Sequence, residues 1–325
     1  MPCGVSWGCS VEASATRYIG RFAPSPTGPL HLGSLVAAVG SYLDARAHQG
    51  IWRLRMEDVD SPRCIPGAAD QILHALEAFE FSWDGPVEVQ SQRLAAYQDA
   101  LSGLQSQQWV YPCFCSRKKI LSYGARTSVD GSRVYPGVCR LHRMHDGATP
   151  PERSPAWRLQ VPDEIHCFED RFLGPQTQNL ARDVGDFVLF RADGLFAYQL
   201  AVVVDDGWQG ITDVVRGSDL LVSTARQIWL QRCLGLPTPR YGHLPLVCNA
   251  AGEKLSKQTR APALLLKTAS EKIRQLIQAM GFLGLPVSPV LQDASLAELW
   301  RWGVDHWARK QKIIVPDNHV HNQTG

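Results

Sequence analysis

Apolar and polar residues recur with two different periods along the first hundred residues of the chain. A short apolar run, YIGRFA at 18–23, predicts a buried strand, and the residues from Gly33 to His48 have the apolar spacing of a helix. The segment IWRLRMEDVD, which begins at Ile51, predicts a second strand whose end carries acidic groups. PGAADQILHALEAFEF and SQRLAAYQDALSGLQSQQ predict two further helices. Strands that alternate with helices favour an α/β fold with a parallel sheet.

A regular pattern returns after residue 185. We expect a hairpin with the turn ADG at 192–194, and a buried strand in LAVVVDD at 200–206. A helix is predicted from about Leu220 to Leu234, a strand in HLPLVCN, and a loop in AAGEKLSKQ. A helix from Ala269 to Met280 and a tryptophan-rich tail close the chain.

The middle of the chain, from about 110 to 180, is rich in Pro, Gly, Arg and Cys and reads as an insertion. The predicted organisation has five parts: a disordered lead-in at 1–16, the first half of a catalytic domain at 17–110, the insertion at 111–180, the second half at 181–258, and a short helical C-terminal region at 259–325.

Composition narrows the class of protein. The 325 residues are 45% hydrophobic and 20% charged, which is typical of a globular domain with a sizeable core. The net charge of +2 neither requires nor excludes a nucleic-acid partner. Nine cysteines, no signal-peptide pattern and no apolar run long enough for a membrane span indicate a reducing, cytoplasmic compartment. We expect a monomer.

The segment from Arg117 to Arg153 is more basic than the whole chain. It carries eight Lys or Arg (117, 118, 119, 126, 133, 140, 143, 153) and three acids (130, 146, 152), so its net charge is 8 − 3 = +5. A solvated loop and a surface that faces nucleic-acid phosphates are both compatible with this pattern.

The stretch RFAPSPTGPLHLG, from Arg21 to Gly33, places three prolines between a predicted strand and a predicted helix. Backbone N–H groups at the positive end of a helix bind phosphates, and His31 lies at that junction. The prolines stiffen the loop before a ligand arrives, which reduces the entropy lost on binding. An ordinary stiff turn would have the same composition.

A second fragment, KLSKQ at 254–258, follows a predicted strand and a glycine. Two lysines three residues apart in one loop can reach the same triphosphate, although such loops are more often solvated surface.

Together, HLGS and KLSKQ resemble the two signature sequences of class I aminoacyl-tRNA synthetases in order and separation. RFAPSPTGPLHLG with LRMEDVD narrows the resemblance to the glutamyl-tRNA synthetase catalytic domain, over roughly Tyr18 to Gln258. The chain departs from the family at two positions. Ser34 replaces the second histidine of the first signature, and Gln258 replaces the final serine of the second. The resemblance implies a Rossmann-like catalytic domain and ligase-type activity.

The resemblance also implies roles at matching positions. The glutamate site would be formed by Arg21, Ala23, Ser25, Glu57, Tyr198 and Arg216, and the ATP site by His31, Gly33, Lys254, Ser256 and Lys257. A ligand with two carboxylates and one ammonium needs arginine for the former and an acid for the latter, so the residue types agree with this assignment. His31 and Lys257 would act on the phosphates in catalysis, with Mg²⁺ assisting.

Three cysteines of the insertion, Cys113, Cys115 and Cys139, suggest a structural Zn²⁺ that needs a fourth ligand. General chemistry points to His142 or His145. The resemblance points to Tyr135, because a small relative of glutamyl-tRNA synthetase has this C-x-C…Y-x-x-x-C arrangement. Three unlinked cysteines are the simpler alternative.

After Gln258 only 325 − 258 = 67 residues remain, too few for the helical anticodon-binding domain of a full glutamyl-tRNA synthetase. The small relative lacks that domain, activates L-glutamate with ATP without tRNA, and transfers it to the queuosine base in the anticodon of tRNA(Asp). The alternatives are a truncated conventional enzyme that charges a tRNA 3′ end, a non-catalytic RNA-binding paralogue, and a small-molecule nucleotidyltransferase that shares the histidine signature. The last is disfavoured by the glutamate-site residues and by the cysteines.

Overall fold

The computed structural model describes residues 17–128, 131, 133–142, 154–246 and 262–313. The elements of the first part are β1 (Ile19–Phe22), α1 (Leu32–Ala47), β2 (Ile51–Met56), α2 (Ala68–Ala78), β3 (Glu88–Val89), α3 (Leu94–Ser106) and β4 (Val110–Cys113). Those of the middle are α4 (Arg117–Ser122), α5 (Val138–His142), β5 (Ala156–Leu159), β6 (Ile165–Asp170), β7 (Gly174–Asn179), α6 (Leu180–Asp183) and β8 (Phe187–Phe190). The remainder are α7 (Tyr198–Trp208), β9 (Asp213–Gly217), α8 (Leu221–Leu234), β10 (Arg240–Leu244), α9 (Ala269–Phe282) and α10 (Leu296–Lys310).

The parallel sheet predicted from the alternation of strands and helices is present. β1, β2 and β3 pair in parallel, and so do β9, β10 and β6, with β7 antiparallel at the edge. The two groups meet where the Thr212 N–H donates to the Ile19 carbonyl oxygen at 2.9 Å. β1 and β9 are therefore neighbours in the middle of the strand order, with β2 and β3 on one side and β10 and β6 on the other. α/β sheets bind ligands in the crevice at such a switch point, beyond the carboxyl ends of the strands.

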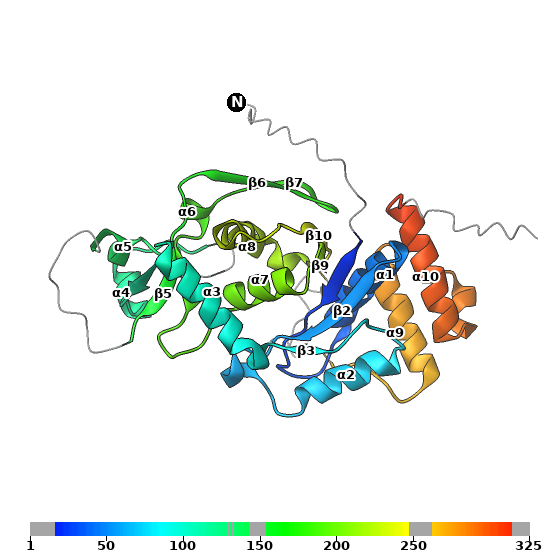
Figure 1. Cartoon of the computed structure of the whole chain (residues 1–325). Helices are drawn as coiled ribbons and strands as arrows, with labels where there is room; N and C mark the ends of the chain where they lie inside the picture. The colour runs from blue at the N-terminus through cyan, green and yellow to red at the C-terminus, as the bar shows by residue number, and fades with distance from the viewer. Residues whose placement is uncertain (1–16, 129–130, 132, 143–153, 247–261, 314–325) are drawn as a thin grey trace, which may run out of the picture.

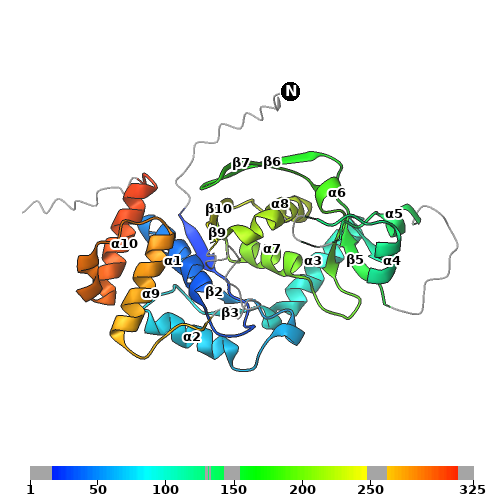
Figure 2. The ribbon, with the colours of Figure 1, turned by 180° about the vertical axis from the view of Figure 1, so that it is seen from behind.

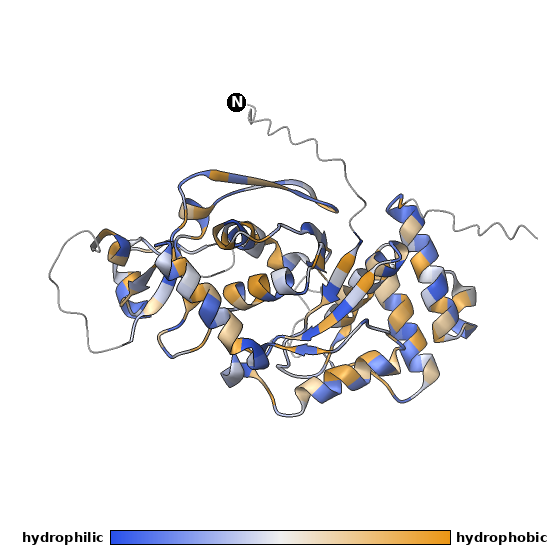
Figure 3. Cartoon of the chain, viewed as in Figure 1, coloured by the Kyte–Doolittle hydropathy of each residue, from blue (hydrophilic) through white to orange (hydrophobic). Residues whose placement is uncertain are grey.

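The core fills the space between this sheet and its helices. α1 is buried along most of its length between the sheet and the C-terminal helices α9 and α10 (Figures 1 and 2). Colouring by hydropathy shows apolar stretches on α2, α9 and the strands, interrupted by polar turns (Figure 3). Asp44 of α1 is fully buried and accepts bonds from Trp307 Nε1 at 3.0 Å and from Arg171 Nη2 at 3.0 Å. This carboxylate ties α10 and the end of β6 to α1.

The strands of the middle region belong to two different sheets. β4, β5 and β8 form an antiparallel sheet, while β6 pairs with β10 of the parallel sheet. α4 and α5 lie at the end of the molecule opposite to α10 in both ribbon views (Figures 1 and 2). The division of the chain into the five ranges given above stays a prediction.

One predicted strand is wrong. LAVVVDD at 200–206 lies inside helix α7. A continuous apolar run does not distinguish a buried strand from a buried helix, and the local excess of valine favoured the strand. Tertiary packing decides for the helix, because it buries Asp205 and Asp206 against polar partners of β1, β2 and α3. The turn at 192–194 is present, but the strand predicted after it is reduced to a bridge between Phe190 and Phe196.

The other predicted elements agree with the structure within a few residues. The strand predicted in HLPLVCN begins earlier, at Arg240, and its last three residues, like the predicted lead-in at 1–16, lie outside the described residues. Within the described part, no helix is both long and apolar enough to cross a bilayer.

Candidate active site

A cavity of about 540 Å³ opens at the carboxyl ends of β1, β2 and β9. The sequence-predicted residues Arg21, Ala23, Ser25, His31, Gly33, Glu57, Tyr198 and Arg216 all line it. They come from β1 and β9, from the loops after β1 and β2, and from the first turns of α1 and α7. Arg21, Glu57 and Arg216 meet because the parallel strands end at the same edge of the sheet. Lys254, Ser256 and Lys257 lie outside the described residues. The chain on both sides of them lies at the cavity, since Leu246 lines it and Ala263 forms a bridge with His31.

The junction before α1 is built as its sequence suggests. His31 is the N-cap of α1, and its Nδ1 accepts a hydrogen bond from the Ser34 N–H at 3.3 Å. A neutral imidazole that accepts at Nδ1 carries its proton on Nε2. In this tautomer His31 carries its ring N–H on Nε2, beside the positive end of a helix that attracts anions.

The floor of the cavity contains a buried group of alternating charges. Arg21 pairs with Asp206 at 3.1 Å, and Arg55 pairs with Asp206 at 2.7 Å and with Glu57 at 3.3 Å. Burial opposes ionisation of Asp206, but the two arginines outweigh it and lower the pKa of this carboxyl. Burial dominates at Glu57 and raises its pKa despite the same two arginines. Glu57 is thus an acid that a cationic ligand group would stabilise in its charged form.

Arg216 differs from the other arginines of the cavity. It is 5% exposed, yet its partners are neutral: His243 Nε2 at 3.1 Å, Gln227 Oε1 at 2.8 Å, Thr224 Oγ1 at 2.9 Å and the Leu220 carbonyl oxygen at 3.3 Å. Within the described part of the chain, no carboxylate lies within ion-pair distance of it. A buried guanidinium held only by neutral acceptors strongly favours an incoming anion.

Sequence reasoning missed several residues of this site. Asp206 and Arg55 lie behind Arg21, and His243 and Asp170 lie behind Arg216. The polar residues within apolar runs were the available signal: the acidic pair that ends LAVVVDD, and the histidine that opens HLPLVCN. Their partners lie dozens of residues away in sequence, so only the fold brings them together.

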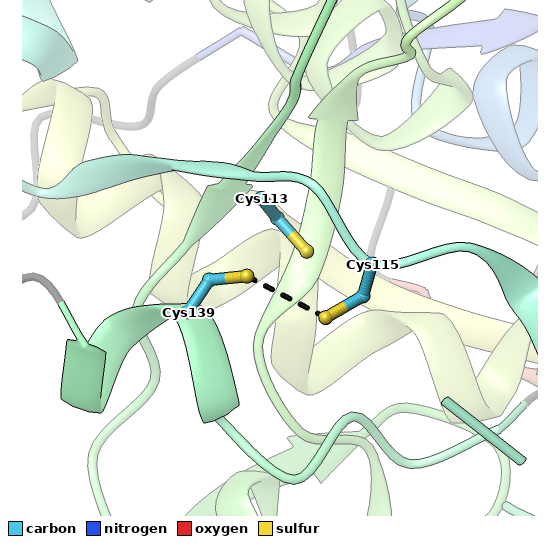
Figure 4. A group of neighbouring side chains, drawn as sticks. All are labelled: Cys113, Cys115 and Cys139. Atoms are coloured by element: carbon cyan, nitrogen blue, oxygen red, sulfur yellow. Dashed lines mark hydrogen bonds between the residues drawn. The ribbon is translucent and has the colours of Figure 1, made fainter. Parts of the chain in front are cut away.

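The cysteines of the middle region form a second centre. The sulfur atoms of Cys113, Cys115 and Cys139 lie within 4.8 Å of one another and point toward one another from β4, the loop after it and α5 (Figure 4). The Cys115 and Cys139 sulfurs are 3.5 Å apart, and the Tyr135 hydroxyl is 3.5 Å from the Cys115 sulfur. Tetrahedral Zn²⁺ with bonds of about 2.3 Å to sulfur separates its ligand atoms by roughly 3.8 Å, so these residues fit such an ion.

Tyr135 is positioned for this cluster by the surrounding fold. It is 3% exposed, its hydroxyl accepts the Cys139 N–H at 2.8 Å, and the Arg158 guanidinium lies 4.0 Å from its ring centroid. Burial, with the bonds to the cysteines, raises the pKa of its hydroxyl, and burial raises the pKa of the Cys115 thiol to about 11. A metal ion would have to displace protons from these groups on binding. The side chain of His142 and the whole of His145 lie outside the described part.

Comparison with known proteins identifies the family. Residues 19–288 match the family model of the catalytic domain of class I tRNA synthetases (E and Q).

The chain belongs to the class I tRNA synthetase (E and Q) family.

Relatives within the family are similar over most of their length. The glutamyl-Q tRNA(Asp) synthetase of Dechloromonas aromatica is 55% identical over 305 residues, which are 92% of this chain and 98% of that protein. The protein of the same name from Neisseria meningitidis serogroup B is 56% identical over 292 residues, 89% of this chain and 95% of that one.

Solved structures of the family share the fold. The glutamate–tRNA synthetase of Elizabethkingia anophelis superimposes with a TM-score of 0.67 and 25% identity over 88% of this chain. The chain spans 65% of the length of that synthetase. The class I synthetase fold expected from the signature sequences is thereby confirmed.

Proposed function

We propose that this protein activates L-glutamate with ATP and transfers it to the queuosine base in the anticodon of tRNA(Asp). The observation that carries the proposal is Arg216, a buried cation that has no carboxylate partner among the described residues and shares one cavity with the acid Glu57 and with His31. Free glutamate offers its side-chain carboxylate to Arg216 and its ammonium to Glu57, while its α-carboxylate reacts with ATP. The identity of 55% to glutamyl-Q tRNA(Asp) synthetases supports the same reading.

In the first step an oxygen of the glutamate α-carboxylate forms a bond to the α-phosphorus of ATP. The bond from that phosphorus to the bridging oxygen breaks, and pyrophosphate leaves. No protein nucleophile is needed, so positioning and charge stabilisation account for the rate. The His31 N–H and the Lys257 ammonium are assigned to the phosphates, Lys257 from the resemblance alone. Mg²⁺ bound with ATP would neutralise part of the phosphate charge.

In the second step a hydroxyl of the queuosine diol attacks the activated carbonyl, and AMP leaves. The basic segment from Arg117 to Arg153 is assigned to the phosphates of the RNA. Its described part includes α4, where Arg117, Lys118 and Lys119 are exposed. Each cation bound to a phosphate releases a counterion, so transfer to RNA should weaken steeply with salt, while glutamate activation should not.

The decisive experiment uses labelled glutamate, ATP, tRNA(Glu) and two preparations of tRNA(Asp), with queuosine or guanosine at the modified position. Pyrophosphate exchange is measured first, without tRNA. The label is then mapped by nuclease digestion. Label confined to the queuosine-containing anticodon fragment supports the proposal. Label on the 3′ adenosine of tRNA(Glu) identifies a conventional glutamyl enzyme, and exchange without any transfer contradicts the proposed acceptor. No exchange together with no label on any tRNA identifies a non-catalytic paralogue.

We also propose that Cys113, Cys115, Cys139 and Tyr135 hold one structural Zn²⁺ and that the chain acts as a monomer. Metal analysis of protein purified without chelators should give about one Zn²⁺ per chain. Cys139→Ser should lose the metal while the parallel sheet stays folded. Light scattering should give the mass of a single chain in solution. Metal-free wild-type protein with full stability would contradict the zinc assignment.

A further inference from the structure

Two buried residues lie behind Arg216 and do not themselves line the cavity. His243 of β10 and Asp170 at the end of β6 are 0% and 1% exposed. His243 lies directly beside Arg216 in the parallel pairing of β10 with β9. Asp170 is the register partner of Tyr241 in the parallel pairing of β10 with β6. Three adjacent strands thus bring a carboxylate, an imidazole and a guanidinium into one line.

The hydrogen bonds of this line define the protonation of His243. Arg216 can only donate, and its Nε–H points at His243 Nε2 over 3.1 Å, so Nε2 must be an acceptor. The proton of the neutral ring then lies on Nδ1, which donates to Asp170 Oδ2 at 2.5 Å. Burial lowers the pKa of His243, with Arg216 acting in the same direction, and keeps the ring neutral although Asp170 opposes this.

Asp170 is itself held in a single orientation. Its Oδ1 accepts the backbone N–H groups of Phe172 at 3.1 Å, Leu173 at 3.0 Å and His243 at 3.2 Å. Only Oδ2 is directed at the imidazole. The carboxylate charge is satisfied by N–H groups and is separated from Arg216 by the width of the ring.

We propose that Asp170 and His243 are positioning residues that hold Arg216 ready for the carboxylate of the amino-acid substrate. Asp170 selects the imidazole tautomer that accepts from Arg216. The neutral ring orients the guanidinium without neutralising it, which a carboxylate in direct contact would do. The inference rests on the proposed function, because the substrate carboxylate is the anion for which Arg216 is kept.

The sharpest test is Asp170→Asn. Asparagine keeps an oxygen for the three backbone N–H groups, so its NH₂ group must face His243 Nδ1. An NH₂ donor there forces the ring proton onto Nε2, where it opposes the Arg216 N–H. Loss of a partner that sets a histidine tautomer typically reduces function about 10–100-fold. We expect KM for glutamate to rise by about that factor in pyrophosphate exchange, with KM for ATP unchanged.

A second variant separates positioning from general damage. In His243→Gln the side-chain oxygen can replace Nε2 as the acceptor from Arg216, and the side-chain amide has no ring proton to place. His243→Gln should therefore bind glutamate better than Asp170→Asn. Asp186→Asn is the matched control. That buried carboxylate accepts the Val161 N–H and the Tyr111 hydroxyl, away from Arg216, so its KM for glutamate should not change.

A spectroscopic readout makes the test independent of activity. Nitrogen-15 shifts of labelled histidine distinguish the two neutral tautomers, and the His243→Gln spectrum assigns the signal. We expect an Nδ1–H ring in the wild type and an Nε2–H ring in Asp170→Asn. An unchanged tautomer or an unchanged KM for glutamate in Asp170→Asn, or a KM for glutamate in His243→Gln that rises as much as in Asp170→Asn, would each overturn the inference. Absence of glutamate-dependent exchange in the wild type would instead contradict the proposed function, while the tautomer shift would still be measurable.

Discussion

Replacing Arg216 by alanine tests the basis of amino-acid selection. The side chain is 5% exposed and has four neutral acceptors, so a glutamate carboxylate would be its anionic partner in a desolvated site. Truncating one partner of such a buried charge pair costs about 2–5 kcal/mol. With about 1.4 kcal/mol per tenfold change, kcat/KM for glutamate should fall by about 30- to 4000-fold.

Glutamine gives the internal control for this prediction. Its side-chain amide cannot neutralise a guanidinium, so activation of glutamine should change far less, and selectivity for glutamate should fall with the glutamate rate. The assay is pyrophosphate exchange with glutamate, glutamine and ATP titrated separately. KM for ATP should stay near the wild-type value.

A second arginine of the same sheet controls for loss of charge alone. Arg240 is the first residue of β10, at the end of the strand away from the cavity. It pairs with Asp213 at 2.9 Å and is largely exposed. Arg240→Ala should leave glutamate activation unchanged. A melting temperature close to that of the wild type would establish that each variant is folded. Wild-type kcat and KM for glutamate in folded Arg216→Ala would refute the assignment of this residue.

Four further outcomes are expected. Lys257→Ala should slow adenylate formation by about 10²–10³, as removal of one oxyanion donor does, measured by single-turnover kinetics; a wild-type rate would refute the phosphate role. Tyr135→Phe should weaken zinc binding at least about tenfold in a chelator competition, and unchanged affinity would favour a histidine ligand. Gly185→Ala should lower the free energy of unfolding of the region around Tyr135 and the three cysteines by about 1–3 kcal/mol, because φ is +72° and a Cβ atom would lie 2.7 Å from the backbone N and O of Tyr135. Gly194→Ala, which also has a positive φ but an open surrounding, should have the smaller effect in urea unfolding. The folded-state pKa of His243 lies below its ordinary value of 6.5, so the folded protein binds fewer protons. The contribution of His243 to the free energy of unfolding should therefore be fully present above pH 6.5 and be lost as the pH falls toward the folded pKa. This loss of stability should be smaller in His243→Gln.

Much of the candidate site could be predicted from short stretches of sequence. His31 is the N-cap of α1, as the strand, proline loop and helix in RFAPSPTGPLHLG suggest. Cys113 and Cys115 are two residues apart in the chain, and Cys139 lies close enough in sequence for a local turn to bring it back. These predictions depend on interactions within one or two adjacent elements, which the order of residues largely determines.

Other features depend on groups that only the folded chain brings together. In the helix formed by LAVVVDD, Asp205 pairs with Arg93, and Asp206 pairs with Arg55 and Arg21. Burying these carboxylates without such partners would be strongly unfavourable. The pairing therefore favours the helix.

The line from Asp170 through His243 to Arg216 spans three strands that are adjacent in space. Its bonded residues are 73 and 27 residues apart in sequence, since 243 − 170 = 73 and 243 − 216 = 27. The sequence predicted, through the family resemblance, that Arg216 precedes a helix and belongs to a glutamate site, but it did not predict the strand β9 on which Arg216 lies. Only the tertiary structure decided that neutral groups would surround Arg216. In a buried site a charge is neutralised by whichever partner the fold places beside it. The neutral partners of Arg216 therefore leave its charge available for a ligand.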